Sequence, residues 1–527
     1  MNILRRGLLA GVPALLLPSL ARAEPRNGGV LRFVVNPEPS TLVCIDNSFG
    51  AAQKIGPKVN EGLLSYDFTL KPQPQLATAW SISEDGLRYT FTLRPNVFWH
   101  DGKPFTADDV KFSILTLKRT HPRGRGTFSS VTDVKTPDAL TAVIELSRPA
   151  PYLITALAAC ESPIVPRHVY DGTDVTANPN GEHPIGTGPF LFREWVKGSH
   201  VILDRNPNYW DKPKPYLDRI IIRFIPDGGA RAASFEAKEL DLGGDTPVPM
   251  GDLERVKAIP YIGLETRGYQ YTGNQSQLVF NLDTKPLQDL RVRQAIAHAV
   301  DLKALLATAW YGYGRVSPTP ISPLLTQFND PSIKPYTYDP ALSGRLLDEA
   351  GLPRDQAGKR LPLRLTFNPY NDGNRRSAEF IRQALARVGV DATLAAYDFA
   401  AFVKTVYTDR TFDLESEQLS NTFDPTLGVQ RVYWSKNFKP GLGFSNGAHY
   451  TSETADRLLE AAAVEPDPMA RRELFFKFQK VVYDDVPVLN LIAFDTVTVF
   501  NRRVQNHTLT ADGVNANFAD VWLDGIA

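Results

Sequence analysis

Cysteine is almost absent from this chain, which has only Cys44 and Cys160 in 527 residues. Two cysteines can form at most one disulfide, so a fold held together by several disulfides is excluded. The sequence leaves open whether the two pair or remain free, buried thiols. Net charge is lacking as well, because 58 Lys and Arg balance 58 Asp and Glu. Strong binding to nucleic acid or to an anionic membrane surface is therefore not expected.

Catalytic and metal-binding motifs are also missing. The eight histidines are spread along the chain, and no H-x-x-x-H or C-x-x-C spacing occurs, which argues against a preformed zinc site. Segment 443–447 (GFSNG) has the letters of a serine-nucleophile motif but not its strand-to-helix context. The glycine-rich segment 185–190 lacks the Lys-Ser/Thr of a phosphate-binding loop. We therefore expect a binding protein with no catalytic residues, no metal site and no cofactor.

The N-terminus has the composition of an export signal. Arg5 and Arg6 precede an apolar run over residues 7–17, and residues 21–23 (ARA) fit the small-x-small cleavage rule. We predict that residues 1–23 are a signal peptide, because the run is too short for a membrane anchor. The paired arginines also fit the twin-arginine export pattern, although an ordinary signal remains open. Either route predicts a periplasmic protein.

Adjacent His100 and Asp101 raise the question of a catalytic pair. Residues 87–94 alternate between apolar and polar side chains, which predicts a half-buried strand just before this pair. Thr106 and Asp109 match the capping box that opens a helix. The predicted buried face of that helix consists of Val110, Ile114 and Leu117. We therefore interpret this segment as a turn from strand to helix, not as a catalytic site.

The second half of the chain alternates between strands and helices. Residues 363–367 predict a strand, residues 374–388 an amphipathic helix closed by Gly389, and residues 390–394 the next strand. A single helix is predicted from residue 290 to residue 306. The fold class is therefore α/β. A chain of this length exceeds the roughly 250 to 300 residues of a single core, so two or three domains are expected.

Several motifs, taken in chain order, resemble those of the family 5 extracellular solute-binding proteins. These are the dipeptide-, oligopeptide- and nickel-binding receptors of ATP-binding-cassette importers. The matching segments are 74–80 (PQLATAW), 99–110 (WHDGKPFTADDV), 164–168 (IVPRH), 184–190 (PIGTGPF), 205–210 (RNPNYW) and 291–296 (RVRQAI). The resemblance covers essentially the whole chain after residue 23.

The resemblance implies a periplasmic-binding-protein type II-like fold, with two lobes joined by a hinge and an extra subdomain inserted in the first lobe. The implied boundaries are 24–57, 184–275 and 492–527 for the first lobe, 58–183 for the insertion and 276–491 for the second lobe. Such a protein closes around a solute and delivers it to a membrane permease. The implied partners are a peptide-sized solute and the permease of an ATP-binding-cassette importer, and we expect a monomer.

The resemblance also implies where the solute binds. In the peptide receptors, an Asp four residues before a Pro pairs with the free amine of the peptide. The matching segment here, residues 418–425 (QLSNTFDP), has Asn421 at that position. An unpaired buried ammonium costs on the order of 3 to 5 kcal/mol, so Asn421 argues against ordinary free-amine peptides and favours a neutral solute rich in hydroxyl or amide groups. Neighbouring motifs add five candidate ligand-binding residues: Ser48, Phe49, Asp245, Gln277 and Asn490.

Other functions remain as alternatives. An exported hydrolase would show turnover of an oligosaccharide, peptide or ester by the purified protein. A solute-sensing or chaperone-like protein on the same fold would lack importer genes beside its own. Nickel import through a small-molecule chelate is neither supported nor excluded by the sparse histidines.

Overall fold

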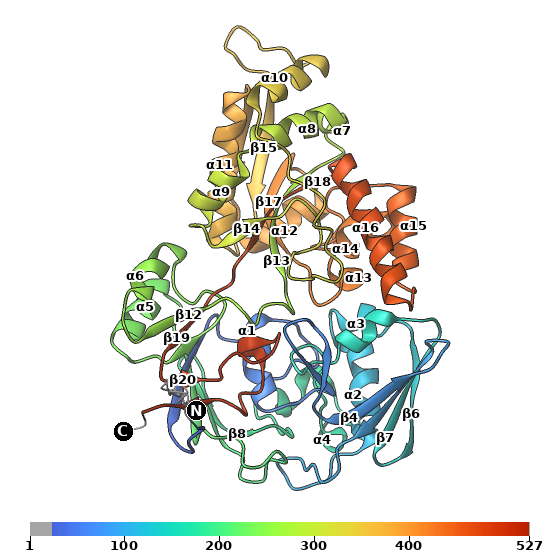
Figure 1. Ribbon diagram of the computed structural model, residues 1–527, viewed down its shortest axis with the longest axis vertical. Helices are drawn as coiled ribbons and strands as arrows, with labels where there is room; N and C mark the ends of the chain where they lie inside the picture. Colours follow the sequence, from blue (N-terminus) through green and yellow to red (C-terminus); the bar gives the residue numbers. More distant parts are fainter. Residues whose placement is uncertain (1–23, 526–527) are drawn as a thin grey trace, which may run out of the picture.

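The computed structural model describes residues 24–525, and the predicted signal peptide lies outside these residues. Figure 1 shows an upper lobe standing on a broader lower lobe. The upper lobe is built on a six-stranded sheet, and the lower lobe contains a seven-stranded sheet on one side and a four-stranded sheet on the other. This two-lobed α/β architecture confirms the predicted fold class.

The seven-stranded sheet of the lower lobe has the order β12-β19-β11-β1-β10-β9-β8. Its strands are β1 (Val30–Val35), β8 (Phe190–Val196), β9 (His200–Arg205), β10 (Arg219–Phe224), β11 (Leu242–Gly243), β12 (Ile262–Glu265) and β19 (Thr498–Asn501). The central strand β1 runs parallel to both of its neighbours, β10 and β11. Strand β19 returns from near the C-terminus to pair with β12, so this sheet is assembled from three distant parts of the chain.

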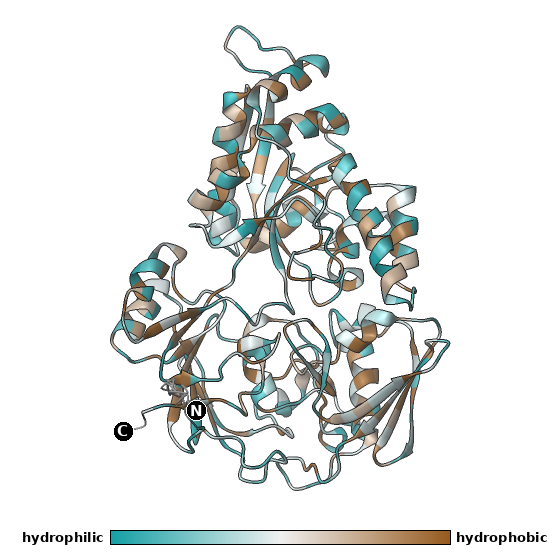
Figure 2. Cartoon of the chain, viewed as in Figure 1, coloured by the Kyte–Doolittle hydropathy of each residue, from teal (hydrophilic) through white to brown (hydrophobic). Residues whose placement is uncertain are grey.

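The six-stranded sheet of the upper lobe has the order β14-β18-β13-β17-β15-β16. Its strands are β13 (Asn274–Phe280), β14 (Gly314–Val316), β15 (Leu361–Phe367), β16 (Val390–Ala395), β17 (Leu414–Ser420) and β18 (Val488–Phe494). The chain from β15 through helix α11 (Asp372–Arg387) to the parallel strand β16 confirms the predicted β-α-β unit. In Figure 2, apolar residues follow these strands and one side of the helices that cover them.

The prediction of a single helix over residues 290–306 was wrong. The structure has two helices there, α8 (Leu290–Ala299) and α9 (Leu302–Ala309). The carboxylate of Asp301 accepts hydrogen bonds from the backbone N–H groups of Lys303 and Ala304, at 3.0 and 3.1 Å. This side chain therefore caps a new helix, which the apolar periodicity across the break had concealed.

The segment around His100 and Asp101 is the predicted turn from strand to helix. Strand β5 (Arg88–Leu93) belongs to the four-stranded sheet, whose other strands are β4 (Ala77–Ile82), β6 (Val131–Asp138) and β7 (Thr141–Leu146). Helix α2 (Ala107–Thr120) begins with the predicted capping box, in which the backbone N–H of Thr106 donates to Asp109 at 2.9 Å. Within residues 24–525, no three His, Cys, Asp or Glu side chains are placed to hold a metal ion.

Two short connections link the lobes. The chain passes upward between β12 and β13, and it returns between β18 and β19, so both crossings lie side by side (Figure 1). The predicted boundaries at residues 275 and 491 fall within a few residues of these crossings. We retain all the predicted domain boundaries as a proposal.

Both cysteines are free and buried, with 1% of Cys44 and 2% of Cys160 exposed. Burial raises the pKa of both thiols.

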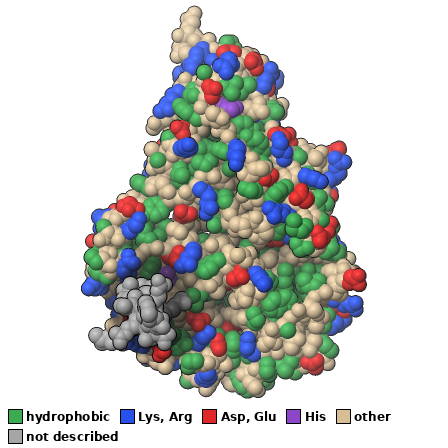
Figure 3. All heavy atoms as spheres, in the orientation of Figure 1, with side chains coloured by type: hydrophobic (Ala, Val, Ile, Leu, Met, Phe, Trp, Pro, Cys, Tyr) green, Lys and Arg blue, Asp and Glu red, His purple; other side chains and the backbone are tan. Residues whose placement is uncertain are grey.

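Acidic and basic side chains are interspersed over the face of the molecule in Figure 3. None of the helices described is both long enough and apolar enough to span a membrane.

A polar cavity between the lobes

A cavity of about 860 Å³ lies between the two lobes. Sites for small molecules usually enclose about 300 to 1,000 Å³, so this cavity has room for a solute the size of a short peptide. The lower lobe lines it with Asn36, Gly50, Gln53, Lys54, Arg123, Glu161, Arg231, Asp245 and Tyr269, and the upper lobe with Tyr370, Asn371, Arg376, Gln418, Ser420 and Thr422, among others. Most of the lining residues are polar, and they come from both lobes.

The back of the cavity is formed by the two crossings between the lobes. Tyr271, Thr272 and Asn274 line it from the first crossing, and Asp495 and Thr496 from the second. The ring of Tyr271 lies 5.5 Å from that of Tyr66 in the lower lobe and 4.5 Å from that of Phe423 in the upper lobe. A change in the angle between the lobes would therefore change the shape of the cavity directly.

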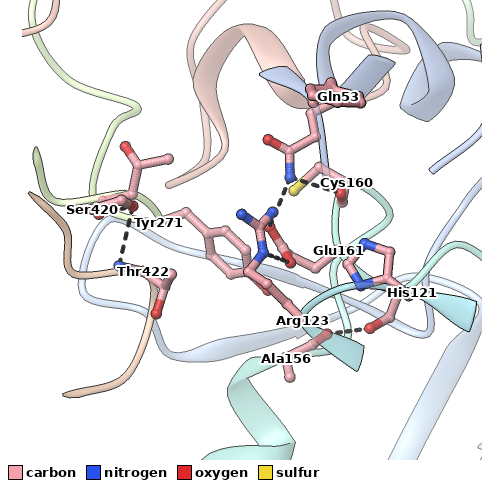
Figure 4. A network of polar contacts seen from close by, with 12 residues as sticks. Gln53, His121, Arg123, Ala156, Cys160, Glu161, Tyr271, Ser420 and Thr422 are labelled. Atoms are coloured by element: carbon pink, nitrogen blue, oxygen red, sulfur yellow. Dashed lines mark hydrogen bonds and ion pairs between the residues drawn. The ribbon is translucent and has the colours of Figure 1, made fainter. Parts of the chain in front are cut away.

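One wall of the cavity carries an ion pair with a third polar partner. Arg123 Nε donates to Glu161 Oε2 at 2.8 Å, and Gln53 Nε2 donates to Glu161 Oε1 at 2.7 Å. Figure 4 shows the guanidinium of Arg123 directed at Glu161, with the amide of Gln53 close by. Arg123 comes from the loop after α2, and Gln53 from helix α1 (Gly50–Ile55). Arg123 is held in place while its side chain stays about one-third exposed to the cavity.

Two further ion pairs neutralise charge in the lining. Lys54 pairs with Asp245 on the lower lobe, and Arg376 pairs with Asp372 at the start of α11. Asp245 adopts a left-handed backbone conformation with φ of 56°, although it is not a glycine. Such conformations cost about 1 to 3 kcal/mol and occur preferentially at functional sites. The fold therefore holds this carboxylate in a fixed position at the edge of the cavity.

Asn421 is completely buried beside the cavity and is not part of its lining. Its Oδ1 accepts a hydrogen bond from the backbone N–H of Ser322 at 2.5 Å, and its Nδ2 has no hydrogen-bond partner among the residues described. Its neighbours Ser420 and Thr422 do line the cavity. The structure therefore places an amide, with no formal charge, directly behind this part of the wall.

The other predicted ligand-binding residues lie in different surroundings. Asp245 lines the cavity, whereas Gln277 and Asn490 are buried in the six-stranded sheet, where Gln277 Nε2 donates to Asn490 Oδ1 at 2.7 Å. Ser48 and Phe49 directly precede the lining residue Gly50, and 67% of Phe49 is exposed. Contact of these residues with a solute stays a prediction.

Sequence reasoning missed most of the charged lining. Arg123 and Glu161 are 38 positions apart, and neither lies in a motif that marks an ion pair. Asp245 is the exception among the charged residues, and the neutral Gln418 belongs to the segment that singled out Asn421. In the structure, its Oε1 accepts a hydrogen bond from Asn371 Nδ2 at 3.0 Å.

Two lobes with a peptide-sized polar cavity at their hinge define the class of binding proteins that close around a solute. Within that class, the chain belongs to the bacterial extracellular solute-binding proteins, family 5. The model of this family matches residues 71–441. The chain therefore serves as the substrate-binding component of an ATP-binding-cassette importer, capturing a solute between its lobes for delivery to a membrane permease. Family members act in the periplasm or outside the cell.

Known relatives agree with this assignment. The dipeptide-binding protein of Escherichia coli K12 is 30% identical over 447 residues, which cover 80% of this chain and 81% of the relative. The structure of DppA from Helicobacter pylori in complex with the peptide STSA is 26% identical, with a TM-score of 0.78 over 94% of this chain and 98% of that one. NikA from Brucella suis in complex with Fe(III)-EDTA is also 26% identical, with a TM-score of 0.81 over 94% of this chain and all of that one. The first two of these relatives are named as binding proteins.

Proposed function

We propose that this protein captures a peptide-sized solute, and that residue 421 does not hold a free α-amine of that solute. Asn421 carries this proposal, because it is buried and presents no carboxylate to the cavity. The relatives bind ligands as different as a peptide and a metal chelate, so the fold alone does not specify the solute. We also propose that the protein acts as a monomer in the periplasm, after export by a twin-arginine or ordinary signal, and has no catalytic activity.

The four basic side chains that line the cavity already have acceptors within the protein, so the lining offers little to an anionic solute. Three of these side chains, Lys54, Arg123 and Arg376, have carboxylate partners. The fourth, Arg231, donates to backbone carbonyl groups of Ile225 and Pro226. The hydroxyl and amide groups of Ser420, Thr422, Asn371 and Gln418 therefore supply polar contacts that do not require an ionised ligand.

Native mass spectrometry of the protein purified from its own periplasm tests solute capture. We expect a small molecule to co-purify and to be released on denaturation. Ser420→Trp fills the cavity and should abolish this extra mass, whereas Ser332→Trp, on an exposed loop, should retain it. Equal retention by both variants would place the solute outside the cavity and refute this part of the proposal.

A pair of tripeptides tests the argument from Asn421. Wild-type protein is expected to bind trialanine no more tightly than its N-acetylated form, because Asn421 cannot neutralise an ammonium. Titration calorimetry is expected to give the two forms dissociation constants within tenfold of each other, a difference of less than about 1.4 kcal/mol. A tenfold preference of the wild-type protein for the free amine would overturn the argument.

A further inference from the structure

A second cavity, of about 180 Å³, lies in the lower lobe next to the inter-lobe cavity. Asp512 and Asn515 line both cavities, so the segment from Thr510 to Asn515 forms the wall that the two share. The rings of Tyr209 and Trp210 line the smaller cavity on another side. Its volume suits the end of a solute, not a whole one.

The smaller cavity is acidic. Its charged lining consists of three carboxylates, from Asp211, Asp512 and Asp520, and one ammonium, from Lys214. The ammonium is shared by Asp211 at 3.0 Å and Asp520 at 2.8 Å. Asp512 is thus left without an ion pair among the residues described, and the lining carries an excess of negative charge.

Asp512 is only 7% exposed, yet its buried carboxylate has few hydrogen-bond or ion-pair partners to offset the loss of water. The one hydrogen bond found for it within residues 24–525 is a long contact with the thiol of Cys160, at 3.9 Å. The buried ammonium of Lys58 donates instead to the carbonyl groups of Val514 and Ala516, at 2.5 and 2.7 Å. Burial, together with the nearby carboxylate of Glu161, raises the pKa of Asp512 to about 7, although Lys58 acts in the opposite direction.

Two neutral oxygens beside Asp512 also lack donors. Thr510 Oγ1 and Asn515 Oδ1 are buried and have no hydrogen-bond partner among the residues described. An unsatisfied buried polar atom costs about 1 to 3 kcal/mol, so such atoms usually have a partner when the protein is at work. One short segment thus contains three oxygens that lack a strong hydrogen-bond partner among the residues described. An ammonium or guanidinium group carries only donors and complements them.

We propose that the Thr510–Asn515 wall is a subsite for an ammonium or guanidinium group on an arm of the captured solute. The inference rests on the proposed function, since it assigns one end of the solute bound between the lobes. It also accounts for the amide at position 421: the cationic group of the solute is recognised in the lower lobe, away from the position where the peptide receptors hold an α-amine.

Methylguanidinium, with N-methylurea as its neutral counterpart, tests the subsite by ligand-observed NMR titration. Wild-type protein is expected to bind methylguanidinium saturably and N-methylurea at least tenfold more weakly. Asp512→Asn should weaken methylguanidinium binding at least tenfold, and Thr510→Val severalfold. Asp46→Asn removes the same charge from a partly buried carboxylate that lines neither cavity, and it should bind like the wild type. Far-UV circular dichroism establishes that the variants are folded.

Three results would overturn the inference. Equal binding of the two probes would mean that the smaller cavity does not recognise positive charge. Unchanged methylguanidinium binding in folded Asp512→Asn protein would place the cation elsewhere. A co-purified solute without a cationic group would show that the subsite does not serve the solute. Each of these results leaves solute capture intact, because loss of the co-purified solute in Ser420→Trp tests that function separately.

Discussion

Replacement of Arg471 by methionine is expected to lower the free energy of unfolding by about 3 to 5 kcal/mol, the usual cost of breaking a buried ion pair. Arg471 and Asp424 have side chains that are 5% and 1% exposed. They form a bidentate ion pair, in which Arg471 Nη1 and Nη2 lie 2.8 and 2.7 Å from the carboxylate oxygens of Asp424. Methionine fills similar volume but leaves Asp424 charged, buried and without its cation.

The effect should be large because Arg471 joins several elements. It lies on α16 (Pro468–Asp485) and donates from Nε to the carbonyl of Ala462, at the end of α15 (Glu453–Ala462). Asp424 also caps α13 (Pro425–Gly428), which directly follows the cavity wall at Thr422. The variant therefore loses the connection between the loop after β17 and two helices.

Chemical denaturation with a matched control measures this loss. Lys480→Met removes a cation from an exposed ion pair with Asp484 on the same helix and should cost no more than about 0.5 kcal/mol. The double variant Asp424→Leu/Arg471→Met should regain part of the loss, since it leaves no unpaired charge. Equal midpoints for Arg471→Met and Lys480→Met would show that the buried pair contributes nothing special.

Glu61→Gln is expected to gain about 2 to 3 kcal/mol of stability relative to the wild type when the pH rises from 5 to 8. Burial raises the pKa of Glu61 from 4.5 to about 7, although Tyr209, Trp210 and Thr187 donate hydrogen bonds to it at 2.7, 2.9 and 3.0 Å. The folded state therefore holds this proton more tightly than the unfolded chain does. The stabilisation of the folded state by this proton is complete below about pH 4.5 and is lost as the pH rises to 7. Glutamine mimics the protonated form at every pH.

The difference between variant and wild type is the quantity to measure, because other groups act in the same pH range. Burial lowers the pKa of His100, His121 and His507 to about 4, so these side chains favour the folded state increasingly as the pH rises from 4 to 6.5. Their effect opposes that of Glu61 in the wild-type curve and cancels in the difference. Glu453→Gln, on an exposed helix start, should follow the wild type. A constant gap between Glu61→Gln and wild-type unfolding midpoints at pH 5 and 8 would contradict the prediction.

Local chemistry explains which elements could be predicted. The capping box of α2 and the β-α-β unit around α11 depend on residues a few positions apart, and both formed as expected. The same kind of reasoning missed the break at Asp301, because apolar spacing continued through it and only the cap separates α8 from α9. The cavity lining is harder to predict, since its ion pairs join residues 4 to 191 positions apart that share no motif.

The sequence by itself determined the fold class, the family and the missing carboxylate at position 421, because ordered motifs and single residue identities are properties of the chain alone. Only the tertiary structure decided where charge remains uncompensated. Asp512 is 352 positions from Cys160 and lies in a segment with no distinguishing composition. Its burial between two cavities, without a cation in contact, results from the packing of the C-terminal segment against the lower lobe, and long-range packing of this kind is not encoded in any local pattern.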